Sequence, residues 1–202
     1  MQITVIGSTG HTGRHVLEQG RERGHAMVAF TRRPAALRDP SVVTVVSGDG
    51  RDPAALSAAL TGSAAAIAIV GNGRSGPHHA GAVATALVAA MAQTGVRRLL
   101  TVSAYPVAAR RPRIPVAIIR RVFAAVYADL AVMEEIVAAS GLDWAIIRPG
   151  RLTDGPRTGR GTLHRGDMHR VPAVSRADLA SVLLDQAQAP GTAGRALNLA
   201  GG

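Results

Sequence analysis

The sequence contains neither cysteine nor lysine, because all 23 of its Lys-or-Arg positions are arginine. Without cysteine the chain can form no disulfide, no thiolate nucleophile and no cysteine metal site, and we expect no bound metal. Without lysine it can supply no Schiff base, no P-loop lysine and no Tyr-x-x-x-Lys catalytic pair. These absences remove several enzyme classes, and they fit the cytoplasmic location that we expect.

Aromatic residues and long apolar runs are also scarce. Only 2% of the residues are aromatic, so the core must be built from Ala, Val, Leu and Ile. The apolar stretches 64–70 and 80–92 are too short or too rich in small residues to span a bilayer, and no secretory signal is apparent, so we expect no membrane partner. The formal net charge is +10, but the arginines are scattered and no aromatic stacking platform accompanies them. We therefore do not expect a nucleic-acid partner.

Strand-like and helix-like segments alternate through most of the 202 residues. Continuous apolar strands separated by helices are typical of a parallel sheet that is covered on both faces. The sequence therefore predicts one α/β domain over residues 1–202, a Rossmann-type, doubly wound and mostly parallel sheet. The predicted strands are 3–6, 26–30, 42–46, 64–70, 98–103, 143–148 and 195–199. The predicted helices are 14–23, 53–60, 79–94, 115–139 and 176–188, the last capped by Ser175, and residues 150–170 are predicted as a loop with a short strand near 162–163.

The first strand ends in a glycine-rich turn, Gly-Ser-Thr-Gly-His-Thr-Gly at 7–13. Gly7 permits a sharp turn, Gly10 lets backbone N–H groups approach a pyrophosphate, and Gly13 lets the helix pack closely on the strand. The helix N-terminus presents unpaired N–H groups and a partial positive charge to phosphates. This arrangement predicts a dinucleotide site that also includes Thr9, His11 and Thr12.

A basic pair, Arg32 and Arg33, ends the second strand. An NAD site usually places Asp or Glu there, roughly 20 residues past the glycines, to bond the ribose 2′-hydroxyl. A guanidinium instead grips a 2′-phosphate through charge-assisted hydrogen bonds. The pair therefore favours NADP(H) over NAD(H), although a surface arginine pair on an arginine-rich chain would look the same.

In a doubly wound sheet, ligands lie outside the carboxyl ends of the strands. This rule selects the remaining candidate residues: Asp49 for the adenine amino group, Ser103 and Tyr105 as catalytic residues beside the nicotinamide, and Val70, Gly71, Asn72, Ala104, Pro149, Gly150, Arg151 and Leu152 as further cofactor-binding residues. Two alternatives stay open. Ser103 could bond its own backbone, and Tyr105 could simply pack against Pro106 and the following loop.

Longer segments carry a family resemblance. They are the turn at 7–13, Thr-Arg-Arg-Pro at 31–34, Val-Ser-Ala at 102–104, Met-Glu at 133–134, Ser-Gly-Leu-Asp-Trp at 140–144, Arg-Pro-Gly-Arg-Leu-Thr-Asp-Gly-Pro at 148–156 and Val-Ser-Arg-Ala-Asp-Leu-Ala at 174–180. The chain resembles the atypical short-chain dehydrogenase/reductase group of NAD(P)H-binding, NmrA-like proteins, and within it the flavin reductase/biliverdin-IXβ reductase-like branch. The resemblance implies that Ser103 contacts the nicotinamide or the acceptor and that the turn 150–152 backs the nicotinamide ring.

The same resemblance implies an NADPH-dependent reductase whose small-molecule acceptor is a flavin, a quinone or a tetrapyrrole, with flavin as a possible substrate. One departure is plain: Tyr127 is followed four residues later by Ala131 and not by lysine. Two alternatives remain, a non-catalytic NADP(H)-binding redox sensor of NmrA type and an isomerase, epimerase or dehydratase acting on a sugar derivative. His164 or His169 could donate a proton from the loop, and the chain could be a monomer or a homodimer.

Overall fold

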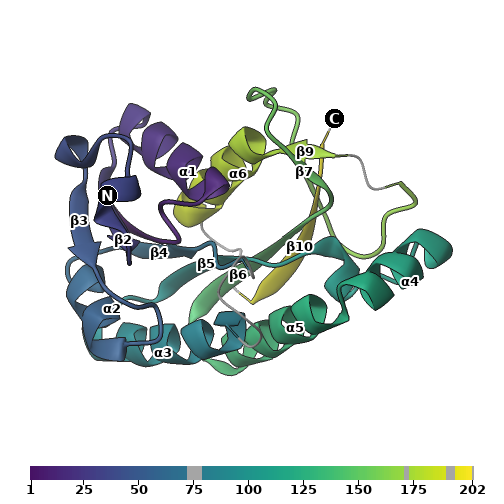
Figure 1. Cartoon of the computed structure of the whole chain (residues 1–202), viewed down its shortest axis with the longest axis horizontal. Coiled ribbons are helices and arrows are strands. Elements are labelled where there is room, and N and C mark those ends of the chain that lie inside the picture. Colours follow the sequence, from purple (N-terminus) through teal and green to yellow (C-terminus); the bar gives the residue numbers. More distant parts are fainter. Residues whose placement is uncertain (72–78, 171–172, 190–193, 202) are drawn as a thin grey trace.

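The computed structural model describes residues 1–71, 79–170, 173–189 and 194–201, and it has an α/β fold (Figure 1). Its main sheet has eight strands in the order β3-β2-β1-β4-β5-β6-β10-β8. Every neighbouring pair is parallel except β10 and β8, which are antiparallel. The strands are β1 (Gln2–Ile6), β2 (Ala26–Thr31), β3 (Thr44–Ser47), β4 (Ala65–Ala68), β5 (Arg98–Val102), β6 (Asp143–Pro149), β8 (Thr162–His164) and β10 (Arg195–Ala200). The predicted fold class, a doubly wound and mostly parallel sheet, is confirmed.

Two helical layers cover the sheet. Helices α1 (His11–Glu22) and α6 (Arg176–Gln188) pack together on one face, and α2 (Pro53–Leu60), α3 (His79–Thr94) and α5 (Ala124–Ala139) cover the other (Figure 1). Each face has its own cluster of buried apolar side chains. The central strand β4 is buried at all four positions, which explains its continuous apolar sequence.

The predicted long helix over 115–139 is wrong, because the structure has two helices there. Helix α4 (Arg113–Val122) ends at Phe123, whose φ of −113° and ψ of 33° are not helical, and α5 begins at the next residue. Neither proline nor glycine marks this break. Helix α5 packs mainly on α3 and also contacts the short 3₁₀ helix η3 (Tyr105–Val107), whereas α4 contacts η3 and α5.

The predicted third strand begins two residues too early. Pro40–Val42 form a 3₁₀ turn, η2, which Asp39 caps by accepting a hydrogen bond from the Ser41 backbone N–H. Proline near the start of such a turn is favourable because its φ is already set. A second 3₁₀ turn, η1, spans Pro34–Ala36.

The segment after β6 contains more strand than expected. Two short strands, β7 (Leu152–Thr153) and β9 (Val174–Ser175), pair in parallel as a separate small sheet. The short strand predicted near 162–163 is confirmed as β8. Ser175 caps α6 by accepting from the Asp178 backbone N–H at 2.9 Å, as predicted.

Candidate dinucleotide-binding site

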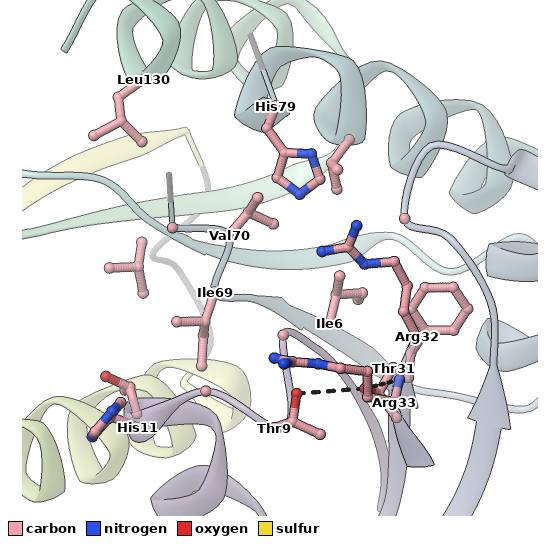
Figure 2. A pocket seen from close by; sticks show the side chains of 18 of the residues that line it. Ile6, Thr9, His11, Thr31, Arg32, Arg33, Ile69, Val70, His79 and Leu130 are labelled. Carbon is pink, nitrogen blue, oxygen red and sulfur yellow. Dashed lines mark hydrogen bonds between the residues drawn. The ribbon is translucent and has the colours of Figure 1, made fainter. Parts of the chain in front are cut away.

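A cavity of about 1090 Å³ opens at the carboxyl ends of β1, β2, β4 and β5. The glycine turn lines one side, the end of β2 and the start of α3 line another, and α5 contributes an apolar wall (Figure 2). This position is where a parallel doubly wound sheet binds its ligand. Among the predicted residues, the cavity is lined by Gly7, Thr9, Gly10, His11, Thr12, Arg32, Arg33, Val70, Gly71, Ser103 and Leu152.

Backbone crowding explains two of the glycines in the turn. Gly7 has a φ of +84°, and a Cβ there would lie 2.2 Å from the carbonyl oxygen of Ile69. A Cβ on Gly13 would lie 2.3 Å from the carbonyl oxygen of Gly7, so only glycine lets α1 approach the turn this closely. At Gly10 the nearest atom would be 3.2 Å away. The protein itself therefore tolerates a Cβ at Gly10 better than at Gly7 or Gly13.

The start of α1 fits a phosphate group. Gly10 is the N-cap and offers no side-chain cap, and the first turn of α1 contains no acidic residue. The first N–H groups of a helix have no partner within the helix, and the helix dipole places partial positive charge there. The residues present therefore fit the pyrophosphate of a dinucleotide.

The two arginines after β2 line the cavity on the β2–β3 side of the sheet, away from β5. Thr31 organises this corner: its hydroxyl accepts a hydrogen bond from the Arg33 backbone N–H at 3.0 Å and lies 3.4 Å from the Thr9 hydroxyl (Figure 2). The Arg32 guanidinium points toward the ring of His79, the first residue of α3. Burial lowers the pKa of His79, and the charges of Arg32 and Arg51 lower it further.

Asp49 does not line the cavity, although its neighbours Gly48 and Gly50 do. Its carboxylate accepts hydrogen bonds from the backbone N–H of Arg51 at 2.9 Å and from that residue's guanidinium at 2.8 and 3.1 Å. These bonds hold the pKa of Asp49 well below its usual range. Arg51 therefore holds this carboxylate beside the cavity lining, and the role of Asp49 in binding the adenine amino group stays a prediction.

Ser103 is the buried polar residue at the β5 end of the cavity. Its side chain is only 6% exposed, and its hydroxyl oxygen makes no hydrogen bond with any residue in the described ranges. The alternative that this hydroxyl bonds its own backbone is therefore not what the structure shows. A buried hydroxyl without a partner is costly, so a ligand in the cavity is a natural partner for it.

Tyr105 has a different role from the predicted catalytic one. It is 1% exposed and lies outside the cavity lining. Its hydroxyl accepts a hydrogen bond from the Met168 backbone N–H and donates to the carbonyl oxygen of Arg111, both at 2.7 Å. Tyr105 therefore connects η3 to two neighbouring loops. This agrees with the alternative that Tyr105 is a packing residue.

The remaining predicted residues lie outside the cavity lining or beyond the described ranges. Gly13 packs behind the turn, and Ala104, Pro149, Gly150 and Arg151 are not among the lining residues. Asn72 lies outside the described residues. His164 and His169 are exposed and do not line the cavity, so this structure does not place them against an acceptor there.

Among the cavity residues with a charged or titratable side chain, His79 and Arg176 escaped the sequence prediction. His79 begins the helix that follows the fourth strand, so the strand-end rule could have found it. Arg176 is the first residue of α6 and donates to Asp154 at 2.7 Å, and the His11 ring lies 3.7 Å from the same carboxylate oxygen. No sequence signal places α6 beside the glycine turn, because that contact depends on the packing of α1 on α6.

Asp129 fixes the start of α3 from the neighbouring helix α5. It is 1% exposed, and its carboxylate accepts hydrogen bonds from the backbone N–H groups of Ala80 at 2.8 Å and Gly81 at 2.9 Å. The negative charge also complements the helix dipole. His79 is thereby held at the edge of the cavity.

Two kinds of feature are absent from the ranges that the structure describes. None of their helices is long and apolar enough to cross a membrane. In the same ranges no group of three or more His, Asp or Glu side chains is placed to hold a metal ion.

Comparison with known proteins agrees with this geometry. A family model described as NAD(P)H-binding matches residues 7–190. The "Uncharacterized sugar epimerase YhfK" of Bacillus subtilis is 28% identical over 211 residues, which cover 100% of this chain and 95% of that protein. The anaerobilin reductase ChuY of Escherichia coli O157:H7 has a TM-score of 0.82 at 22% identity, covering 100% of this chain and 97% of that one. A Veillonella parvula short-chain dehydrogenase/reductase in complex with NADP has a TM-score of 0.83 at 17% identity, covering 98% of this chain and 94% of that one.

Proposed function

The chain belongs to the NAD(P)H-binding family, and from this premise we propose that it is an NADPH-dependent reductase of a flat, conjugated acceptor. The acceptor classes are flavins, quinones and tetrapyrrole-like molecules. The observation that carries the proposal is the cavity itself. It joins a dinucleotide cradle and two arginines at one end to apolar walls and a Ser103 hydroxyl that has no partner among the described residues at the other.

The preference for NADPH rests on Arg32 and Arg33. Both line the cavity at the end of β2, where an NAD-binding protein usually carries an acid. A carboxylate there would repel a 2′-phosphate, whereas a guanidinium attracts it. A unit charge pair at about 4 Å with an effective dielectric constant of about 20 is worth roughly 4 kcal/mol before desolvation costs are subtracted.

The opposite end of the cavity would hold the nicotinamide and the acceptor. Ser103 offers a hydroxyl there, and Val102, Val126, Leu130 and Leu152 surround it with apolar surface. A bound NADPH would supply a hydride, which is two electrons with one proton. The protein's own contribution is to orient the two rings and to exclude water.

The lack of a Tyr–Lys pair narrows the range of possible acceptors. Alcohol–carbonyl chemistry needs a matched proton donor, and Tyr127 has Ala131 where a lysine partner would stand. Burial raises the pKa of Tyr127, and its ring packs edge-on against Phe123 and does not line the cavity. A conjugated acceptor delocalises the charge that arrives with the hydride and can take its proton from water, so it needs no such pair.

Two relatives support parts of the proposal. ChuY is described as an anaerobilin reductase, and the Veillonella protein was solved with NADP. The name of the Bacillus relative points instead to sugar epimerisation. We do not favour that activity here, because chains of that group generally use a Tyr–Lys pair, and this sequence contains no lysine.

The test is NADPH oxidation by the purified protein with FMN, a simple quinone and biliverdin as separate acceptors, and with NADH in parallel. Turnover of at least one acceptor, with NADPH well above NADH, is the expected result. NADPH binding without turnover of any acceptor would contradict the reductase proposal. It would favour the second candidate, a non-catalytic NADP(H) sensor, which the missing Tyr–Lys pair also supports.

A further inference from the structure

Exposed apolar side chains gather on α4 and the first residue after it. In the described part of the chain, eight large apolar side chains are exposed, and six of these lie between residues 114 and 132. We call five of them the α4 face: Ile114 (73% exposed), Ile118 (61%), Ile119 (38%), Val122 (67%) and Phe123 (48%). Contiguous exposed apolar surface usually marks an interaction site.

Helix α4 is oriented with its apolar side outward. Ile114, Ile118 and Val122 are spaced four residues apart, so they share one side of the helix. The helix contacts the rest of the protein through Val116, which is 7% exposed, and through Arg120, whose guanidinium donates to the carbonyl oxygens of Pro106 and Val107. A surface helix of a globular protein normally buries its apolar stripe. Here an arginine faces inward and the stripe faces solvent.

The charges beside the α4 face are basic. Arg110, Arg111 and Arg121 are exposed around it, and no aspartate or glutamate occurs anywhere in residues 53–128. From a distant loop, Asp167 contacts this region, where its carboxylate accepts a hydrogen bond from the Arg110 backbone N–H at 2.9 Å. A partner that complements this surface must therefore combine apolar groups with negative charge.

A second copy of the chain fits poorly. A symmetric contact through the α4 face would bring the arginines of one copy against those of the other. A helix of ten residues is also only about 15 Å long, which gives a contact far below the roughly 800 Å² per partner that a stable dimer buries. A lipid surface needs no such area, because apolar insertion and attraction to anionic headgroups act together.

We propose that the α4 face binds the surface of an anionic lipid bilayer, with α4 lying in the headgroup region and its flanking arginines on the lipid phosphates. This differs from the sequence-based expectation of no membrane partner, which considered only segments that could span a bilayer. The proposal is independent of the reductase function, since no residue of the α4 face lines the cavity.

Vesicle co-sedimentation of the full chain tests the proposal. Two vesicle types are compared, pure phosphatidylcholine and phosphatidylcholine with about one third phosphatidylglycerol. The wild type should bind the anionic vesicles and bind the neutral ones at least about tenfold more weakly. Ile118→Asp should weaken binding to anionic vesicles by about tenfold or more, and Arg121→Glu should weaken it several-fold.

Val42→Asp is the matched control, because Val42 is also exposed (38%) but lies in η2. It should bind vesicles like the wild type, and all variants should bind NADPH normally, which shows that they are folded. Equal binding by wild type and Ile118→Asp, or equal binding to both vesicle types, would overturn the proposal. A lack of binding to either vesicle type would also overturn it. If the chain were then a dimer in sedimentation velocity, and Ile118→Asp dissociated that dimer, the α4 face would be an interface between copies.

Discussion

The guanidinium of Arg32 points toward the ring of His79 at one end of the cavity (Figure 2). The two residues come from the end of β2 and the start of α3, which are nearly fifty positions apart in the sequence. Their proximity places the Arg32 charge beside a titratable ring, where the 2′-phosphate of NADPH would lie.

Arg32→Ala and Arg33→Ala should each weaken NADPH binding by about 1–3 kcal/mol, because each removes a charge-assisted hydrogen bond to the 2′-phosphate. NADH binding should remain nearly unchanged. Titration of the protein with both nucleotides measures the two affinities. Arg38→Ala is the matched control, since Arg38 is an exposed arginine of the same connection that does not line the cavity. Equal losses for NADPH and NADH would contradict the assignment of the 2′-phosphate to these arginines.

NADPH affinity should increase as the pH falls from about 8 toward 6.5, and NADH affinity should change much less. In the free protein the pKa of His79 lies below its ordinary value of 6.5, owing to burial and to Arg32 and Arg51, with Asp49 and Asp129 acting in the opposite direction. A bound 2′-phosphate adds negative charge and raises that pKa, so the complex binds more protons than the free protein, and by linkage lower pH favours it. Below about pH 6 the phosphate itself takes up a proton and the effect should fade.

Calorimetry in two buffers of different ionisation enthalpy checks this expectation through the number of protons taken up. NADPH binding near pH 7 should take up protons, and His79→Gln should abolish the uptake. His164→Gln, a change at an exposed histidine outside the cavity, should leave it intact. Proton release by the wild type would mean that His79 does not sense the phosphate.

Gly10→Val should abolish nucleotide binding and leave the protein folded. A Cβ at Gly10 would lie 3.2 Å from the Gly7 carbonyl oxygen, which then has to shift by only a few tenths of an ångström, but the side chain would occupy the approach to the pyrophosphate. Gly13→Val is the contrasting change, since a Cβ there meets the Gly7 carbonyl oxygen at 2.3 Å and should unfold the β1–α1 unit. Circular dichroism and NADPH titration distinguish the two effects. Retained affinity in Gly10→Val would place the pyrophosphate elsewhere.

Ser103→Ala should lower turnover by about tenfold or more through the loss of one oriented hydrogen bond, with little change in the free energy of unfolding. Stability should hold because the Ser103 hydroxyl has no partner among the described residues, so its removal leaves no group unsatisfied. Ser8→Ala is the control with the opposite pattern: its buried hydroxyl donates to the Phe30 carbonyl oxygen at 2.9 Å, and its loss should destabilise the fold. Urea unfolding and steady-state kinetics measure both quantities. Unchanged turnover in Ser103→Ala would remove this residue from the site.

Asp129→Ala should reduce the free energy of unfolding by about 1–3 kcal/mol, because it leaves the two N–H groups at the start of α3 without an acceptor. NADPH binding should weaken as well, since His79 precedes those groups directly. Asp52→Ala provides the comparison: Asp52 caps α2 in the same manner but is exposed, and its loss should cost about 1 kcal/mol or less without affecting NADPH. Urea titrations followed by circular dichroism give both values. Equal stability of Asp129→Ala and the wild type would show that α3 does not need this cap.

The parts of the protein that the sequence predicted well depend on neighbouring residues. The turn at 7–13 and the arginine pair after β2 are local patterns, and Ser175 needs only the next three residues to cap α6. The predicted bounds of α2, α3 and α6 agree with the observed ones, and α2 and α6 each follow a capping residue, Asp52 and Ser175. The order of strands and helices was enough to predict a doubly wound sheet.

The sequence alone therefore determined the fold class, through the order of its strands and helices. It also determined the glycine turn and the arginine pair as local patterns, since these depend on short-range backbone and charge preferences. Only the tertiary structure placed Arg176 and His79 at the cavity, engaged Tyr105 and Asp49 in other contacts, and turned the apolar side of α4 outward. Each of these features depends on which distant segments the sheet order brings together. Such contacts form between residues far apart in the chain, so no pattern among neighbouring residues can predict them.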